Sequence, residues 1–188
     1  MKRIQRLSLL GILVVLGLAT TSCASIDKTA EQYIADLGSP RENVVENALD
    51  EIEKHYPTSL AAQAKIKTLL MDERIHVKRK AARTLGNAHA EVNETDIKNI
   101  ATLLDAKDAA TIIDGLKSLR NLKAQSTVPK IIPLLQNLNH SVIRDSIRTL
   151  AALGDEKLIP ILQPFLTFPD ENVQKDAAYA IELLKTKP

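Results

Sequence analysis

Residues able to do chemistry are sparse in this sequence and stand apart from one another. The chain has a single cysteine, Cys23, and four histidines, at positions 55, 76, 89 and 140. No two of these residues are four positions apart, the spacing with which a helix presents two ligands to one metal ion. The sequence has neither a glycine-rich phosphate loop nor a nucleophile elbow. We therefore expect no enzyme, and no metal, cofactor or small-molecule substrate.

The cysteine follows a segment that is typical of an export signal. Three basic residues precede an apolar run from Leu7 to Ala19, and small residues then lead to Cys23. An apolar run of about 13 residues is too short to cross a bilayer comfortably but suits the core of a signal peptide. The segment therefore predicts export of the chain.

The four residues "TTSC" at the end of this segment resemble the lipobox of bacterial lipoproteins, with Thr20 where that motif usually has leucine. The resemblance implies cleavage before Cys23 and a lipid on its sulfur; the alternative is an ordinary signal peptide with a cysteine there by chance. We predict a signal peptide over residues 1–22, a lipidated tether over 23–26 and a folded domain over 27–188. The protein is then held at the cell membrane or outer membrane, facing the periplasm or the exterior.

The charge and the composition of the exported part bear on what it can bind and on how its core is built. The whole chain has 25 basic and 23 acidic residues, but three of the basic ones lie in residues 1–22, which contain no acid. The rest is therefore close to neutral, and neither its charge nor its exported address favours binding of nucleic acid. With five aromatic residues and no tryptophan, its core must be built from aliphatic side chains.

A pattern of apolar and small residues recurs every 31 to 34 positions. In a first frame, a residue at position 0 is followed by others at +4, +5 and +8; a second frame between the copies of the first has apolar residues at i, i+3 and i+4. Both spacings are typical of helices. The first frame comprises Val44/Ala48/Leu49/Ile52, Val77/Ala81/Ala82/Leu85, Thr111/Gly115/Leu116/Leu119, Val142/Ser146/Ile147/Leu150 and Val173/Ala177/Ala178/Ile181. The second comprises Ile66/Leu69/Leu70, Ile100/Leu103/Leu104, Ile131/Leu134/Leu135 and Leu162/Phe165/Leu166.

We name the helices that carry these frames first-type and second-type, and each pair of them forms a helical hairpin. Gly86 and Gly154 are expected to end first-type helices, because glycine favours the position after a helix. A further helix over residues 27–40 is expected to cap the stack of hairpins. Turn or cap residues are expected at Asp72, Asn139 and Asp170.

The stretches "DERIHVKRKAARTLG", "ATLLD" and "STVPKIIPLL" resemble HEAT repeats of the phycobilisome-lyase type. The resemblance covers the chain from about Asp27 onward. It implies an all-α protein, a right-handed α-α superhelix of four to five hairpins of the kind found in HEAT and armadillo solenoids. That family includes chromophore lyases, scaffolds and nucleic-acid binders, so the resemblance leaves function open.

One candidate surface is a basic column at position +6 of the first-type helices, opposite their apolar positions. It comprises Arg83, Lys117 and Arg148, and it would suit anionic head groups, lipopolysaccharide or an acidic partner. The alternative is that an aspartate three residues earlier neutralises each base within its own helix. In the second repeat the position three residues before Arg83 holds Lys80 in place of an aspartate. This predicts positive charge without a compensating acid in that repeat.

A second candidate surface lies on the second-type helices, opposite their apolar positions. We name it the proline strip, and it comprises Lys98, Thr102, Pro129, Pro133, Pro160 and Pro164. The resemblance to HEAT solenoids places it on the concave side, where prolines could leave free carbonyl acceptors for an extended partner peptide. The alternative is that the prolines start and bend these helices and bind nothing.

These observations predict a membrane-anchored interaction or scaffold module of the bacterial envelope. It would bind a protein partner through the concave face of the solenoid and would bind no nucleic acid. Two alternatives stay open, a chromophore lyase or isomerase suggested by the repeat type, and a purely structural envelope lipoprotein.

Overall fold

The computed structural model describes residues 28–187. Within this range the secondary structure is entirely helical, which confirms the all-α prediction. No helix in the described range is both long and apolar enough to cross a membrane. The predicted signal peptide, Cys23 and the tether lie outside the described residues.

Five first-type helices form one layer of the described structure, and most of their apolar positions face the core. Leu49, Leu85, Leu116 and Leu150 are all fully buried. In the first of these helices Val45, and not Val44, occupies the fully buried position near the start. The helices are α2 (Glu42–His55), α4 (Ile75–Asn87), α6 (Ala109–Asn121), α8 (His140–Leu153) and α10 (Glu171–Thr186).

The second layer is made of second-type segments, each of which begins as an α-helix and ends as a 3-10 helix. This ending also occurs in the two segments that have no proline, so it belongs to the repeat and is not caused by Pro133 or Pro164 alone. The segments are α3 and η1 (Leu60–Thr68, Leu69–Met71), α5 and η2 (Glu94–Ala101, Thr102–Asp105), α7 and η4 (Val128–Ile131, Ile132–Gln136), and α9 and η6 (Ile159–Leu162, Gln163–Thr167). Two short 3-10 helices precede the last two segments, η3 (Gln125–Thr127) and η5 (Glu156–Leu158).

A short helix, α1 (Ala30–Asp36), packs against α2 and α3 at the N-terminal end of the described stack. Leu37 and Tyr33 point into the core from this segment. The outward side of α1 is polar, because Glu31 and Gln32 are exposed. Helix α1 thus caps the stack as predicted.

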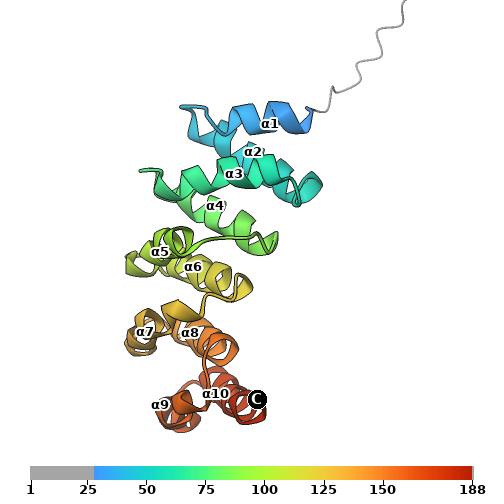
Figure 1. Cartoon of the computed structure of the whole chain (residues 1–188). Helices are drawn as coiled ribbons and strands as arrows, with labels where there is room; N and C mark the ends of the chain where they lie inside the picture. Colours follow the sequence, from blue (N-terminus) through green and yellow to red (C-terminus); the bar gives the residue numbers. More distant parts are fainter. Residues whose placement is uncertain (1–27, 188) are drawn as a thin grey trace, which may run out of the picture.

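The two layers are spaced differently. Each first-type helix contacts the next one directly, whereas the second-type segments pack mainly against first-type helices. Small residues permit the close approach: a Cβ added at Gly86 would lie 2.9 Å from Ser118 Cα of the next first-type helix. A stack bends toward its more closely spaced layer, and Figure 1 shows it bowed with α5, α7 and α9 on the outer side. The prediction that the proline strip lies on the concave side is therefore wrong.

The close approach also explains why Gly86 does not end its helix. Helix α4 continues to Asn87, and Gly86 is buried against α6. The turn comes at His89, whose φ is 47°, and Ala90 N–H donates to Leu85 O at 3.0 Å, as in a Schellman motif. Lys123, with a φ of 55°, closes α6 in the same way. Gly154 does end α8, as predicted, but with an extended backbone.

Side-chain caps stand at the starts of several helices. Asn139 Oδ1 accepts from Ser141 N–H at the start of α8, and Asp170 Oδ1 accepts from Asn172 N–H at the start of α10. Asp72 accepts the backbone N–H of Arg74 in the turn before α4, and the side-chain hydrogen bond from Arg74 lowers the pKa of Asp72. The three predictions of turn or cap residues are thus confirmed.

Candidate protein-interaction surfaces

The predicted basic column belongs to a larger charged surface on the inner side of the bow, which we name the charged face. Its positions lie on the first-type helices, away from the second-type layer. The charged face comprises seven basic and five acidic side chains: Arg79, Lys80, Arg83, Lys117, Arg120, Arg144 and Arg148, with Asp50, Glu53, Asp114, Asp145 and Asp176.

The ion pairs of the charged face join successive repeats. Asp114 lies 3.4 Å from Arg79 of the preceding first-type helix, and Asp176 lies 2.9 Å from Arg148. No ion pair joins Asp114 to Lys117 within α6, or Asp145 to Arg148 within α8, among the pairs of the described residues. The prediction of neutralising pairs within each helix is therefore wrong, because the closely spaced neighbouring helix offers a base to the same carboxylate.

The positive charge of the second repeat is also neutralised, by carboxylates of the preceding first-type helix. Lys80 Nζ lies 2.6 Å from Asp50 of α2, and Arg83 Nη2 lies 3.2 Å from the other oxygen of that carboxylate. Arg83 further approaches Glu53 at 3.7 Å. The prediction that Lys80 leaves uncompensated positive charge in this repeat is therefore wrong.

Lys117 differs from the other two residues of the predicted column. Its side chain is exposed, and within residues 28–187 no carboxylate forms an ion pair with it. It lies on α6, the middle one of the five first-type helices. The charged face thus carries one free cation near its centre, between neighbours whose charges are paired.

Polar side chains extend the inter-repeat contacts across α2, α4 and α6. Asn121 Nδ2 donates to Asn87 Oδ1 at 3.4 Å, and Asn87 Nδ2 donates to Glu53 Oε1 at 2.8 Å. Thr84 Oγ1 donates to the other oxygen of Glu53 at 3.1 Å. Sequence reasoning missed this chain of bonds, although Asn87 and Asn121 stand at the same repeat position, 34 residues apart.

All six residues of the proline strip are exposed, as predicted for an outward surface. They lie on second-type segments, which do not stack directly on one another as the first-type helices do. One side-chain link between two of these segments is the ion pair of Lys130 with Asp105, at 2.8 Å. None of the six lines any of the four clefts that we identify in the described residues. The structure therefore places their segments on one side of the described stack (Figure 1), and none of these four clefts is formed from the six residues.

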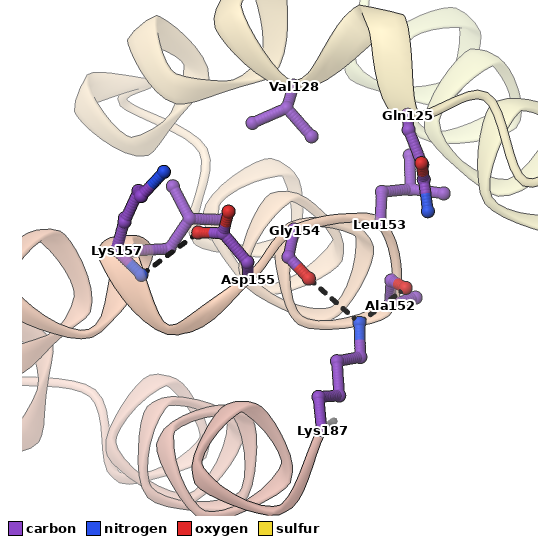
Figure 2. Close-up of a pocket in the computed structure, with 9 residues that line it drawn as sticks. Gln125, Val128, Ala152, Leu153, Gly154, Asp155, Lys157 and Lys187 are labelled. Atoms are coloured by element: carbon purple, nitrogen blue, oxygen red, sulfur yellow. Dashed lines mark hydrogen bonds between the residues drawn. The ribbon is translucent and has the colours of Figure 1, made fainter.

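The largest of these clefts, with a volume of about 740 Å³, lies at the C-terminal end of α8 (Figure 2). Lys187 Nζ donates to Ala152 O at 2.7 Å and to Gly154 O at 3.0 Å, and burial lowers the pKa of Lys187. The other ionisable side chains in the lining are Asp155 and Lys157. Sequence reasoning did not find this cleft, because its walls come from residues up to 62 positions apart.

Comparisons with known proteins support the fold. The family model for HEAT repeats matches residues 97–182, and no curated protein matches the chain. The complex of CpcE and CpcF of phycocyanin lyase from Nostoc sp. PCC7120 is similar, with 26% identity and a TM-score of 0.72 over 86% of this chain and 67% of that chain. A designed armadillo repeat protein in complex with the peptide (KR)4 has 19% identity and a TM-score of 0.60, covering 81% of this chain and 80% of that chain. An engineered protein has 19% identity and a TM-score of 0.66, covering 86% and 81%. The described part of the chain is thus a HEAT- and armadillo-like solenoid.

Proposed function

We propose that this protein is a lipid-anchored interaction module of the bacterial envelope that binds an acidic segment of a protein partner on its charged face. The observation that carries the proposal is Lys117, an exposed cation without an ion pair in the described residues, at the centre of a surface that otherwise pairs its charges. A carboxylate of a partner would form with Lys117 the kind of ion pair that the other bases of the charged face form with carboxylates of neighbouring repeats.

Continuity favours the charged face over the proline strip. Side chains of successive first-type helices are within bonding distance of each other, as in the links from Asn121 to Asn87 and from Asn87 to Glu53. One partner segment can therefore contact several repeats at once. Each further contact then strengthens binding without a second loss of translational and rotational entropy. A designed armadillo repeat protein with a related fold is known in complex with a peptide, which supports peptide binding as a use of such a stack.

Membrane attachment is the part of the proposal that rests on the sequence alone. The motif "TTSC" supplies Cys23 for lipidation, and three residues separate it from the folded domain that the sequence predicts from residue 27 onward. At about 3.3 to 3.6 Å per residue, these three residues reach roughly 10 Å. The solenoid would then lie close to the membrane surface, where confinement raises its effective concentration for membrane partners.

The test is crosslinking in membranes followed by isolation of partners, with the native N-terminus retained. Lys117→Glu should reduce recovery of the dominant partner about tenfold, because attraction becomes repulsion. Lys98→Glu is the matched control, since Lys98 is also an exposed lysine but lies on the proline strip. Loss of the partner from Lys98→Glu or Pro133→Glu, with Lys117→Glu unchanged, would overturn the charged face as the binding surface.

The anchor has a separate readout. Cys23→Ser should abolish incorporation of a labelled fatty acid and move the protein from the membrane fraction to the soluble fraction, while the fold is kept. Fatty-acid labelling that persists in Cys23→Ser would contradict lipidation at this residue. An unlabelled wild-type protein would also contradict it and would leave an ordinary signal peptide.

A second candidate function is assistance of chromophore attachment, favoured by the similarity to the phycocyanin lyase complex. The cleft at the end of α8 is large enough for a small molecule. Incubation of the purified protein with a bilin and an acceptor protein tests this function. Covalent transfer to the acceptor that depends on Lys187 would support it, and absence of transfer would leave the interaction module.

A further inference from the structure

The side of α10 and η6 that faces away from α8 is apolar at its centre and charged at its edges. We name it the C-terminal face. It comprises Leu166, Ala178 and Ile181, which line a cleft of about 220 Å³, and the charged residues Glu171, Lys175, Glu182 and Lys185 of α10.

Leu166 and Ala178 of the C-terminal face occupy positions that are buried in every other repeat, whereas Ile181 is itself only 6% exposed. Position +5 is fully buried at Leu49, Ala82, Leu116 and Ile147, but it is exposed at Ala178. The last position of the second frame is 0% exposed at Leu70, 3% at Leu104 and 6% at Leu135, against 41% at Leu166. In the other repeats a further helix pair follows these positions, whereas within the described residues none follows α10. The C-terminal face thus has the composition of an interface between repeats but lacks a cover in the described structure.

The charged residues of the C-terminal face form one stripe along α10. Residues 171, 175, 178, 182 and 185 follow the 4, 3, 4, 3 spacing that keeps side chains on one side of a helix. The four charged side chains are largely exposed, and their ion pairs lie within the helix. The order of the stripe is acid, base, alanine, acid, base.

This order is complementary to itself when the helix is reversed. If a second copy of α10 lies antiparallel across Ala178, Lys175 faces Glu182 of the copy and Glu171 faces Lys185 of the copy. A parallel arrangement would place like charges together. Alanine at the crossing point lets two helices approach closely, as small residues do in the first-type layer.

We propose that the C-terminal face is a self-association surface, through which two copies of the chain form a two-fold symmetric dimer with antiparallel α10 helices. A two-fold interface needs a patch that is complementary to itself, and the charge stripe meets this condition. The same symmetry places Leu166 of one copy beside Leu166 of the other, so the exposed apolar residues cover each other. Head-to-tail stacking is disfavoured, because within the described residues α1 presents the exposed polar side chains of Glu31 and Gln32 to an oncoming C-terminal face.

Sedimentation equilibrium of the full chain in a density-matched non-ionic detergent tests the proposal. Wild type should sediment as a dimer, and Leu166→Glu should raise the dissociation constant about 100-fold or more, because the charge would be buried without a partner. Leu138→Glu is the matched control, since Leu138 is 98% exposed and lies in a loop away from the face. The control should leave the dimer unchanged.

Charge exchange identifies the antiparallel arrangement. Lys175→Glu and Glu182→Lys should each raise the dissociation constant about tenfold, because each creates two like-charge contacts in the dimer. The double variant should return to within about threefold of wild type, because the contacts are restored with reversed signs. Circular dichroism and thermal melting report that each variant is folded.

Several results would overturn the dimer. A monomeric wild type at all concentrations would do so, and so would a dimer that tolerates Leu166→Glu. A double charge variant as weak as the singles would exclude the antiparallel pairing. Lys117→Glu should leave the dimer intact, so failure of the self-association surface and failure of partner binding on the charged face are separate outcomes.

Discussion

The two ends of the described stack are built in opposite ways. At the N-terminal end, α1 buries Leu37 and Tyr33 against the first hairpin and presents exposed polar residues. At the C-terminal end, α10 and η6 present Ala178 and Leu166 in an arrangement that matches the interior repeats. Solenoids stay soluble when their terminal units have a polar outer side. The first end meets this requirement within the described residues, and the second meets it through the partner copy that we propose.

The difference shows that the burial of a residue in a solenoid depends on whether another repeat packs against it. Ala82 and Ala178 have the same side chain at the same position of the repeat, yet the first is fully buried and the second exposed. What separates them is the presence of another repeat on top. Stability in such a stack is the sum of each repeat and its interfaces, so equivalent substitutions should differ in cost by the missing interface.

The largest expected effect comes from truncating two leucines that occupy the same repeat position, one in the interior of the stack and one at its C-terminal end. Leu104→Ala should lower the free energy of unfolding by about 2 to 5 kcal/mol, because Leu104 is 3% exposed and its removal leaves a cavity. Leu166→Ala should cost less than about 1 kcal/mol in the monomer, since Leu166 is 41% exposed. Urea denaturation at low protein concentration measures both values. Equal costs would show that the end is as well covered as the interior.

A methyl group added between two interior helices should have the next largest effect. Gly86→Ala should destabilise by about 1 to 3 kcal/mol, because its Cβ would lie 2.9 Å from Ser118 Cα and must push α4 from α6. Residue 182 has the same repeat position in α10 but faces no following helix in the monomer, so Glu182→Ala, measured at low protein concentration, is the control and should change the stability of the monomer little. Thermal melting of the two variants measures the difference. A stabilised Gly86→Ala would contradict the close approach of the first-type helices.

A smaller effect, of opposite sign, is expected at Ser146. Its hydroxyl is buried and has no hydrogen-bond partner within the described residues, whereas the same repeat position is alanine in α2, α4 and α10. Ser146→Ala should stabilise the protein by about 1 kcal/mol, because an unsatisfied buried hydroxyl is removed. Ala177→Ser provides the reverse substitution in the terminal repeat. Chemical denaturation measures both, and a loss of stability in Ser146→Ala would reveal a function for the hydroxyl.

The smallest effect concerns the caps of the last two first-type helices. The hydrogen bond from His140, at 2.9 Å, and the capping bonds lower the pKa of Asp170 at the start of α10. Stability from Asp170 is therefore full above its ordinary pKa near 3.9 and is lost as the pH falls through the lowered pKa. Asp170→Asn should make thermal melting less sensitive to acid between about pH 4 and pH 2. Asn139 caps α8 and does not titrate, so Asn139→Asp should add a similar sensitivity.

The sequence predicted the fold closely, because each repeat shows its helical spacing in its own residues. Val77, Ala81 and Leu85 are fully buried as the first frame requires, and Asn139 and Asp170 cap helices as expected. These features depend on contacts within about one turn or one hairpin. Local spacing therefore predicted them well.

The surfaces were predicted less well, because they depend on the spacing between layers. Lys80 has no acid in its own helix, but α2 lies near enough for Asp50 to reach it. Gly86 reads as the end of a helix, yet its missing side chain serves the contact with Ser118. The proline strip is exposed as expected, but it lies on the outer side of the bow.

The sequence by itself determined the helical repeat, the order of its first-type and second-type helices and the capping helix at the N-terminal end. It could do so because the apolar stripe of each helix is set by neighbouring residues and must be buried by stacking. Only the tertiary structure decided which charges pair, which side is inner and which apolar residues stay uncovered. These properties depend on the distance between side chains about 30 positions apart, which follows from how closely the first-type helices pack.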